Sequence, residues 1–191
     1  MNILADPLPE SITVQGEEVP VKTDFRVWIR FTAIVQEYDL DRLTVSDYAD
    51  MVERVSKCCL YKEREITHDL FPAIVSFFSG FTTGKPAKDG GKKTFDYSID
   101  ADAIYSSFAQ AYGIRLAGMP MHWYEFRALF ANLPEESPVG KLIRIRTMKE
   151  NDVPKEKRTE LRALKEAVAL PVYRSYAEDD AVLANLRKAL R

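Results

Sequence analysis

Residues 95–148 read FDYSIDADAIYSSFAQAYGIRLAGMPMHWYEFRALFANLPEESPVGKLIRIRTM. Three segments of this stretch carry apolar residues at helical spacing, which predicts three amphipathic helices. The first begins near Ser98 or Asp100, since either side chain can accept hydrogen bonds from the amides of a first turn, and it ends at Gly113. The second begins at about Trp123 and ends before Pro134, because proline cannot donate the next backbone hydrogen bond.

The third segment opens at Ser137, with Pro138 in the first turn, where proline is favoured. It continues to about Met148, and its Arg144 and Arg146 are predicted to face solvent. No recognisable catalytic constellation occurs in this part of the sequence. These three segments therefore predict a helical scaffold and leave its function open.

The flanking sequence extends the same scaffold. Residues 1–22 form an extended lead-in and a small hairpin, in which Ser11–Val14 and Glu18–Val21 flank a Gln15-Gly16 turn. Further helices are predicted at about 25–38, capped by Thr23 or Asp24, and at 47–60, capped by Ser46, as well as at 70–81, 155–170 and 178–190. The fold class is mainly α, a helical domain of about six to eight helices with a small N-terminal β-hairpin.

The C-terminal helical extension, residues 150–191, ends in a wide apolar stripe. Its apolar residues Val182, Leu183, Leu186, Ala189 and Leu190 share one face of a helix. This stripe is covered by the protein's own core, by a second copy of the chain or by a partner protein. Val182, Leu183, Leu186 and Leu190 are therefore the candidate partner contacts.

Composition indicates one globular domain over residues 1–191, with two helical lobes as an alternative. The 191 residues are 46% hydrophobic and 29% charged, which is enough to bury a sizeable core. The formal net charge is −2, so no overall field favours nucleic acid or an acidic membrane. The charge is uneven, since residues 141–191 hold 13 Lys and Arg against 8 Asp and Glu, whereas residues 1–140 hold 14 against 21.

The two cysteines and the start of the chain point to a reducing cytosol. Cys58 and Cys59 are adjacent, a geometry that does not suit an ordinary disulfide bridge. The first residues show neither the basic region nor the apolar core of a signal peptide. The most apolar run, Leu70 to Phe81, spans only 12 residues and contains a proline, so we interpret it as buried core and not as a membrane span.

Residues 84–94, GKPAKDGGKKT, form the one low-complexity segment and are predicted to be a flexible loop. The phosphate-binding P-loop needs glycine, four residues, and then Gly-Lys-Ser/Thr. Counting from Gly84 places Asp89 where glycine is required, and Lys93 occupies the Ser/Thr position after Gly91-Lys92. The sequence therefore does not match a nucleotide site, and no cofactor is expected.

Two other sets of polar residues invite a metal or catalytic interpretation. Asp96, Asp100 and Asp102 could supply oxygen ligands to a cation, but their spacing lacks the loop glycine and distal glutamate of a calcium loop. Helix capping explains them more simply. His68 and His122 are too few for the usual zinc sets, and His122 stands where a helix begins, which favours capping or a surface role.

Trp123 and Tyr124 could stack on bases or on a peptide. The helical spacing of Trp123 with Phe126 and Phe130 favours packing in the core instead. No Gly-x-Ser-x-Gly turn or Ser/His/Asp set stands in a motif context. The chain is therefore not expected to be an enzyme.

Several motifs, in order along the chain, resemble a known phage family. They are DPLPESITVQGEEVPVKTDFRVWIRF at residues 6–31, SSFAQAYGIRL at 106–116, MHWYEFRALFANLPEES at 121–137 and IRIRTM at 143–148. In this order they resemble the gp fifteen family of bacteriophages, small proteins of siphophages and of prophages in Gram-positive bacteria, encoded just ahead of the tape-measure gene. The resemblance spans nearly the whole chain.

What the resemblance implies is a role in tail assembly, as a non-enzymatic chaperone that binds the phage tape-measure protein in the host cytoplasm. The resemblance assigns no catalytic residue to this chain. Self-association is possible, and neither a membrane nor nucleic acid is an expected partner. Two alternatives stay open, a minor structural component of the tail in the virion and a nucleotide- or nucleic-acid-binding helical module, which only the basic C-terminal third supports.

Overall fold

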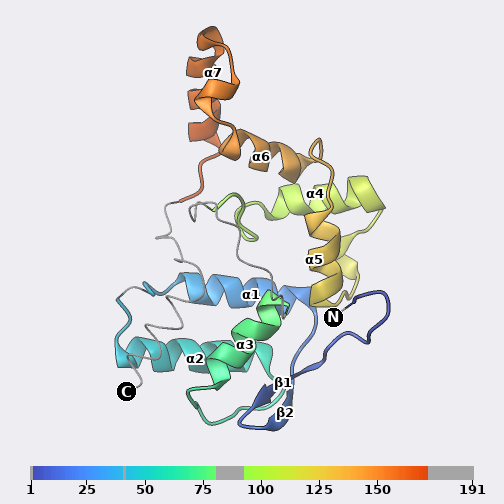
Figure 1. Ribbon diagram of the computed structural model, residues 1–191, viewed down its shortest axis with the longest axis vertical. Coiled ribbons are helices and arrows are strands. Elements are labelled where there is room, and N and C mark those ends of the chain that lie inside the picture. Colours follow the sequence, from blue (N-terminus) through green and yellow to red (C-terminus); the bar gives the residue numbers. More distant parts are fainter. Residues whose placement is uncertain (1, 41, 81–92, 172–191) are drawn as a thin grey trace. The chain divides into compact units, whose positions relative to one another are not determined.

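The computed structural model describes residues 2–40, 42–80 and 93–171, and these fall into two compact units. Unit 1 contains residues 2–40, 42–80 and 120–128, and unit 2 contains residues 93–119 and 129–171. The chain therefore leaves unit 1, returns to it for nine residues and leaves it again. Figure 1 shows the elements of each unit.

Unit 1 begins with the predicted hairpin. Strand β1 (Ser11–Val14) pairs antiparallel with β2 (Glu17–Pro20), and Ile12 lies opposite Val19. Gln15 and Gly16 both have positive φ, 52° and 84°, the conformation that a tight two-residue hairpin turn requires. The second strand begins one residue earlier than the sequence predicts.

Three whole helices follow the hairpin in unit 1, which also includes most of α5 (Trp123–Ala131). They are α1 (Phe25–Gln36), α2 (Val45–Cys59) and α3 (Leu70–Ser79). Helices α1 and α2 lie side by side, and α3 contacts both α2 and β1 (Figure 1). Asp24 caps α1 as predicted, but α2 is capped by Thr44 in a reciprocal capping box with Asp47, and not by Ser46. The β-branched Thr44 lies just outside the helix, where its hydroxyl accepts a hydrogen bond from the Asp47 amide.

The core of unit 1 is a stack of aromatic rings from three helices. Trp28 of α1 is fully buried and stacks on Phe77 of α3, with ring centroids 4.6 Å apart. Trp123, at the start of α5 (Trp123–Ala131), stacks on Phe78 at 5.1 Å and is 1% exposed. Phe126 stacks on Phe25 at 4.6 Å. The prediction that Trp123 packs in a core is confirmed.

Unit 2 is built on α4 (Ala101–Tyr112), α6 (Pro138–Thr147) and α7 (Arg158–Ala167), and it also contains three short 3₁₀ turns. The turns are η1 (Leu116–Gly118), η2 (Glu150–Asp152) and η3 (Lys155–Lys157). Helix α4 packs on α6, and α6 contacts α7 (Figure 1). As predicted, Gly113 ends α4 in a left-handed conformation, and the Ser137 hydroxyl caps α6 with Pro138 in its first turn.

The predicted fold class is confirmed. The described residues contain seven α-helices and a two-stranded antiparallel hairpin near the N-terminus. None of these helices is long and apolar enough to cross a membrane. The predicted helix at 178–190, with its candidate contacts Val182, Leu183, Leu186 and Leu190, lies outside the described residues, as do residues 84–92 of the predicted loop.

Candidate functional site

The starts of α1 and α5 meet in unit 1 through two backbone hydrogen bonds. The Phe25 amide donates to the Met121 carbonyl at 3.0 Å, and the Trp123 amide donates to the Thr23 carbonyl at 2.7 Å. These bonds form an isolated antiparallel bridge that pairs the residues just before the two helices. Two amides that would otherwise lack a partner at the helix starts are thereby satisfied.

His122 caps α5 with both its backbone and its ring. Its amide donates to Oε2 of Glu125 at 3.1 Å, and its Nδ1 accepts from the Tyr124 amide at 3.1 Å. Its Nε2 lies 3.0 Å from the carbonyl oxygen of Pro9. Because a carbonyl only accepts, the proton of the neutral ring is assigned to Nε2. The imidazole thus fastens the N-terminal lead-in to the start of α5, which agrees with the predicted capping role.

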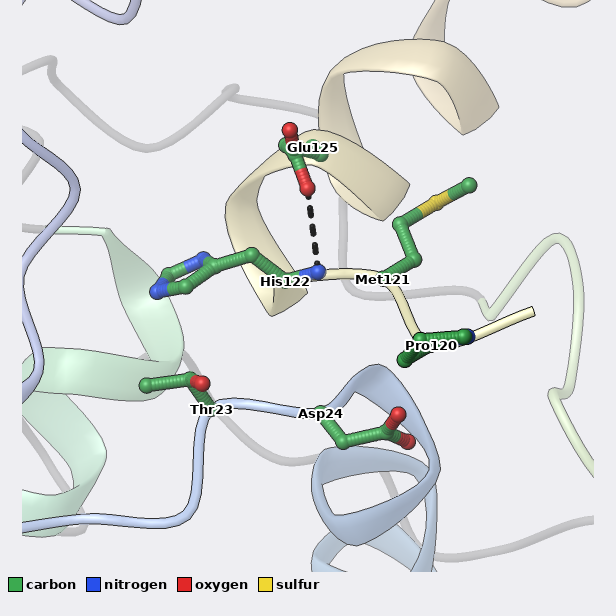
Figure 2. Close-up of a pocket in the computed structure, with 6 residues that line it drawn as sticks. All are labelled: Thr23, Asp24, Pro120, Met121, His122 and Glu125. Carbon is green, nitrogen blue, oxygen red and sulfur yellow. Dashed lines mark hydrogen bonds between the residues drawn. The ribbon is translucent and has the colours of Figure 1, made fainter.

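A pocket of about 210 Å³ opens beside this junction. It is lined by Thr23, Asp24, Pro120, Met121, His122 and Glu125 (Figure 2). An imidazole, two carboxylates and a hydroxyl are the groups from which an acid–base site could be built.

These polar groups are already engaged in holding the junction. Asp24 accepts hydrogen bonds from the backbone and the guanidinium of Arg26, and Glu125 accepts from the His122 amide. Both nitrogens of the His122 ring are in contact with backbone groups. The pocket therefore has the chemistry of a helix junction, and its lining contains no nucleophile paired with a free base.

Side chains of α5 also cap the C-terminal end of α3, and sequence reasoning missed this role. Trp123 Nε1 and Arg127 Nη1 both donate to the Phe78 carbonyl at 2.9 Å, and the Tyr124 hydroxyl donates to the Phe77 carbonyl at 2.7 Å. The last carbonyls of a helix have no partner within the helix. Burial raises the pKa of Tyr124, so this hydroxyl remains a donor. The available sequence signal for this capping role was the set of hydrogen-bond donors in WYEFR, residues 123–127, and not the apolar spacing alone.

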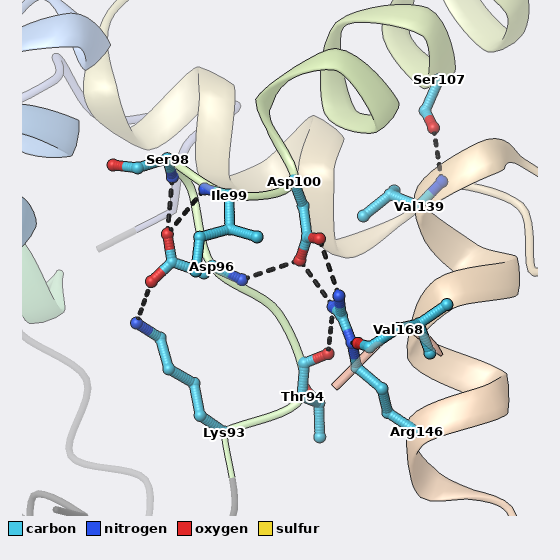
Figure 3. A network of polar contacts seen from close by, with 10 residues as sticks. All are labelled: Lys93, Thr94, Asp96, Ser98, Ile99, Asp100, Ser107, Val139, Arg146 and Val168. Carbon is cyan, nitrogen blue, oxygen red and sulfur yellow. Dashed lines mark hydrogen bonds and ion pairs between the residues drawn. The ribbon is translucent and has the colours of Figure 1, made fainter. Parts of the chain in front are cut away.

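Unit 2 contains a buried ion pair between α4 and α6 (Figure 3). Arg146 binds the Asp100 carboxylate with both terminal nitrogens, at 2.6 and 2.8 Å, and the two side chains are 10% and 3% exposed. Its remaining donors reach the carbonyls of Thr94 and Val168. The prediction that Arg146 faces solvent is wrong, because its guanidinium satisfies three groups brought together from distant parts of the chain. Arg144 is about half exposed and pairs with Glu136.

Asp96 extends this network toward the start of α4. Its Oδ1 accepts the amides of Ser98 and Ile99, at 2.7 and 3.0 Å, and its Oδ2 pairs with Lys93 (Figure 3). Burial opposes ionisation of this carboxyl, yet these hydrogen bonds and the Lys93 charge hold the pKa of Asp96 below its usual value. Asp96 and Asp100 thus organise the turn before α4, and Asp102 lies in the first turn of the helix. Asp100 holds the cap position of α4, but the predicted capping by its side chain does not form, because its carboxylate accepts the Asp96 amide and the Arg146 guanidinium instead.

The other candidates are dispersed. His68 is exposed and lies beside Asp69. Within residues 2–40, 42–80 and 93–171, no group of three or more His, Cys, Asp or Glu side chains is placed to hold a metal ion. The described polar clusters are therefore caps and ion pairs that stabilise each unit.

Comparison with protein families identifies the chain. Residues 4–170 match the family model described as Bacteriophage Gp15 protein. The chain belongs to the bacteriophage Gp15 family. No curated protein and no solved structure matches it.

Membership in the Gp15 family makes the chain a virion-related phage protein. The family is one of structure and morphogenesis rather than of enzymes. The matched range covers every described α-helix and the hairpin. The resemblance noted in the sequence is thereby confirmed at the level of the family.

Proposed function

We propose that this Gp15 protein acts without catalysis as a tail assembly chaperone, which binds the tape-measure protein in the host cytoplasm. The family match over residues 4–170 is the observation that carries the proposal. The engagement of His122, Asp24, Asp100 and Arg146 in structural contacts is consistent with a binding role.

The partner surface that we propose is the apolar stripe of Val182, Leu183, Leu186 and Leu190. These residues recur at helical spacing, and recognition would follow the mode in which an apolar helix face meets the apolar face of a partner. The excess of Lys and Arg over Asp and Glu in residues 141–191 would favour a negatively charged partner. Binding should therefore weaken as the salt concentration is raised.

Co-expression with the tape-measure protein of the same phage tests the proposal. The wild-type chain should co-purify with it and keep it soluble. Leu183→Glu with Leu186→Glu should reduce the co-purified amount at least tenfold. The control is Ala181→Glu with Ala184→Glu, which adds the same charge at positions on the opposite side of a helix from the stripe and should bind as wild type does.

The composition of finished particles separates the proposal from its main alternative. A chaperone should be absent from purified virions in mass spectrometry, whereas a minor tail component would be present in a fixed number of copies. Failure of the wild-type chain to bind the tape-measure protein, together with its presence in particles, would overturn the chaperone role. Salt-dependent retention of labelled DNA in a filter assay would instead favour the nucleic-acid alternative.

A further inference from the structure

Three aromatic rings of unit 2 meet just before α4, and we call them the aromatic cluster. The ring centroid of Phe95 lies 5.0 Å from that of Tyr97 and 4.7 Å from that of Phe130. The centroids of Tyr97 and Phe130 are 5.7 Å apart. Each of the three side chains is half-buried and stays outside the fully buried core. Aromatic rings that gather at such a place mark a surface to which another apolar segment can bind.

The described chain ends close to this cluster. Nε of Arg146 donates to the Val168 carbonyl at 2.7 Å, and Nη1 of the same guanidinium donates to the Thr94 carbonyl at 3.1 Å (Figure 3). Thr94 directly precedes Phe95 of the cluster. One guanidinium therefore holds the end of α7 beside the aromatic cluster, and the rest of the chain continues from there.

The sequence that follows supplies two rings within reach of the cluster. Residues 172–177, which lie outside the described part of the chain, read VYRSYA. Tyr173 is five residues beyond Val168, and five residues can span about 17 Å. Because α7 ends at Ala167, the chain is free to change direction before it reaches the tyrosines. Tyr176 follows three residues after Tyr173, a spacing that places both rings on one side of a helical turn.

We propose that residues 172–177 dock on the aromatic cluster of the same chain, with the rings of Tyr173 and Tyr176 packed against it. Aromatic pairs in tilted or offset arrangements stabilise a contact beyond the area that they bury. Tyrosine suits a half-buried surface, because its ring is apolar while its hydroxyl can remain in contact with water. Docking would hold the C-terminal extension on unit 2. It concerns this chain alone and does not depend on the chaperone role.

A second segment also adjoins the cluster in sequence. Residues 81–92 are joined to it through Lys93 and Thr94, but their one aromatic residue, Phe81, is at the far end of the segment. Residues 172–177 instead have two aromatic residues near a fixed starting point. The C-terminal segment is therefore the occupant that the sequence favours.

Acetylation of tyrosines in the full-length protein by N-acetylimidazole, read by peptide mass spectrometry, tests the proposal. Each rate is normalised to that of the same tyrosine in urea, and Tyr61, which is 66% exposed, is the internal reference. Two aromatic contacts should shift the equilibrium between docked and undocked segments by about tenfold. Tyr173 and Tyr176 should therefore react about tenfold more slowly than Tyr61. Equal rates would overturn the proposal.

Variants of the C-terminal segment identify what covers the cluster. Tyr173→Ser with Tyr176→Ser should raise the acetylation rate of Tyr97 by up to about tenfold. The control is Leu183→Ser with Leu186→Ser, which removes two apolar side chains from the stripe and should leave the Tyr97 rate unchanged. No rise in the tyrosine variant, or an equal rise in the control, would assign the cover to other residues and overturn the proposal.

The reciprocal variant and a dilution series complete the test. Phe130→Ser should speed the acetylation of Tyr173 and Tyr176, provided that circular dichroism shows wild-type helix content. If this variant unfolds, the serine variants of the C-terminal segment still decide, because they leave every described residue intact. Protection of Tyr97 should be independent of protein concentration. Protection that falls on dilution would place the segment on a second copy of the chain and overturn docking within one chain.

Discussion

Trp123 illustrates what single residues contribute in this protein, because it joins apolar burial to a specific hydrogen bond. Its ring stacks between α1 and α3, and its Nε1 caps the Phe78 carbonyl. Trp123→Ala should lower the free energy of unfolding by about 3–5 kcal/mol, through lost burial and the cavity that remains. Urea denaturation measures this. Tyr61→Ala, at a side chain 66% exposed, should change stability by less than about 0.5 kcal/mol.

Arg146 and Arg144 offer a matched pair two residues apart on α6. Arg146→Met would leave the buried Asp100 carboxylate without its cation, which should cost about 3–5 kcal/mol. Arg144→Met removes an exposed pair with Glu136 and should cost less than about 1 kcal/mol. Thermal and urea unfolding of both variants check the difference, and equal costs would mean that the buried pair does not stabilise unit 2.

Asp96 should make the stability of the protein depend on pH. Folding holds the pKa of this carboxyl below its usual value, so the unfolded chain binds the proton more tightly. The contribution is therefore present above about pH 4, the ordinary pKa of Asp, and is lost as pH falls through the lower folded value. Asp96→Asn should cost about 1–2 kcal/mol at pH 7, and the difference between the two proteins should shrink in urea titrations as pH falls below about 4. A constant difference would contradict this assignment.

At the scale of elements, the end of α3 depends both on the left-handed backbone of Gly80 and on the hydrogen bond from Arg127 to the Phe78 carbonyl. Gly80 has φ +80°, and a Cβ on it would lie 2.4 Å from Nη1 of Arg127, which caps Phe78. Gly80→Ala should therefore cost about 1–2 kcal/mol for the left-handed backbone and about 1 kcal/mol more for the displaced hydrogen bond.

Two comparisons separate these contributions. Gly113 ends α4 with φ +68°, and a Cβ on it would meet nothing within 4 Å, so Gly113→Ala should show the backbone cost alone. In an Arg127→Ala background, Gly80→Ala should lose the additional cost. Urea unfolding of the four variants measures both, and full additivity of Gly80→Ala and Arg127→Ala would rule out the coupling.

The sequence predicted elements well where the signal is local. Gly113, Ser137 and Pro138 mark helix ends through their own backbone preferences, and these marks were confirmed. The cap of α2 was misassigned because Thr44 and Ser46 both have a hydroxyl at a suitable position, and only the contact with Asp47 decides between them. The burial of Arg146 was not predictable, since its partners come from residues 94, 100 and 168.

At the scale of the whole molecule, far-ultraviolet circular dichroism should give a helix-dominated spectrum. The described residues are 55% helical, with strand confined to the hairpin at residues 11–20. A sheet-dominated spectrum would contradict the fold. Periodicity could predict this class, but it could not predict the division into two units, because that division depends on contacts between segments far apart in the chain.

The return of residues 120–128 to unit 1 has a consequence for biosynthesis. The ribosome finishes α3 at residue 79, yet the rings of Trp123 and Phe126 and the donors that cap Phe77 and Phe78 come from about 45 residues later. At roughly 5–20 residues per second, the nascent chain would wait about 2–10 s with this core incomplete. Translation must therefore pass α5 before the N-terminal half of the protein can close, and a product terminated earlier would expose its aromatic residues to aggregation.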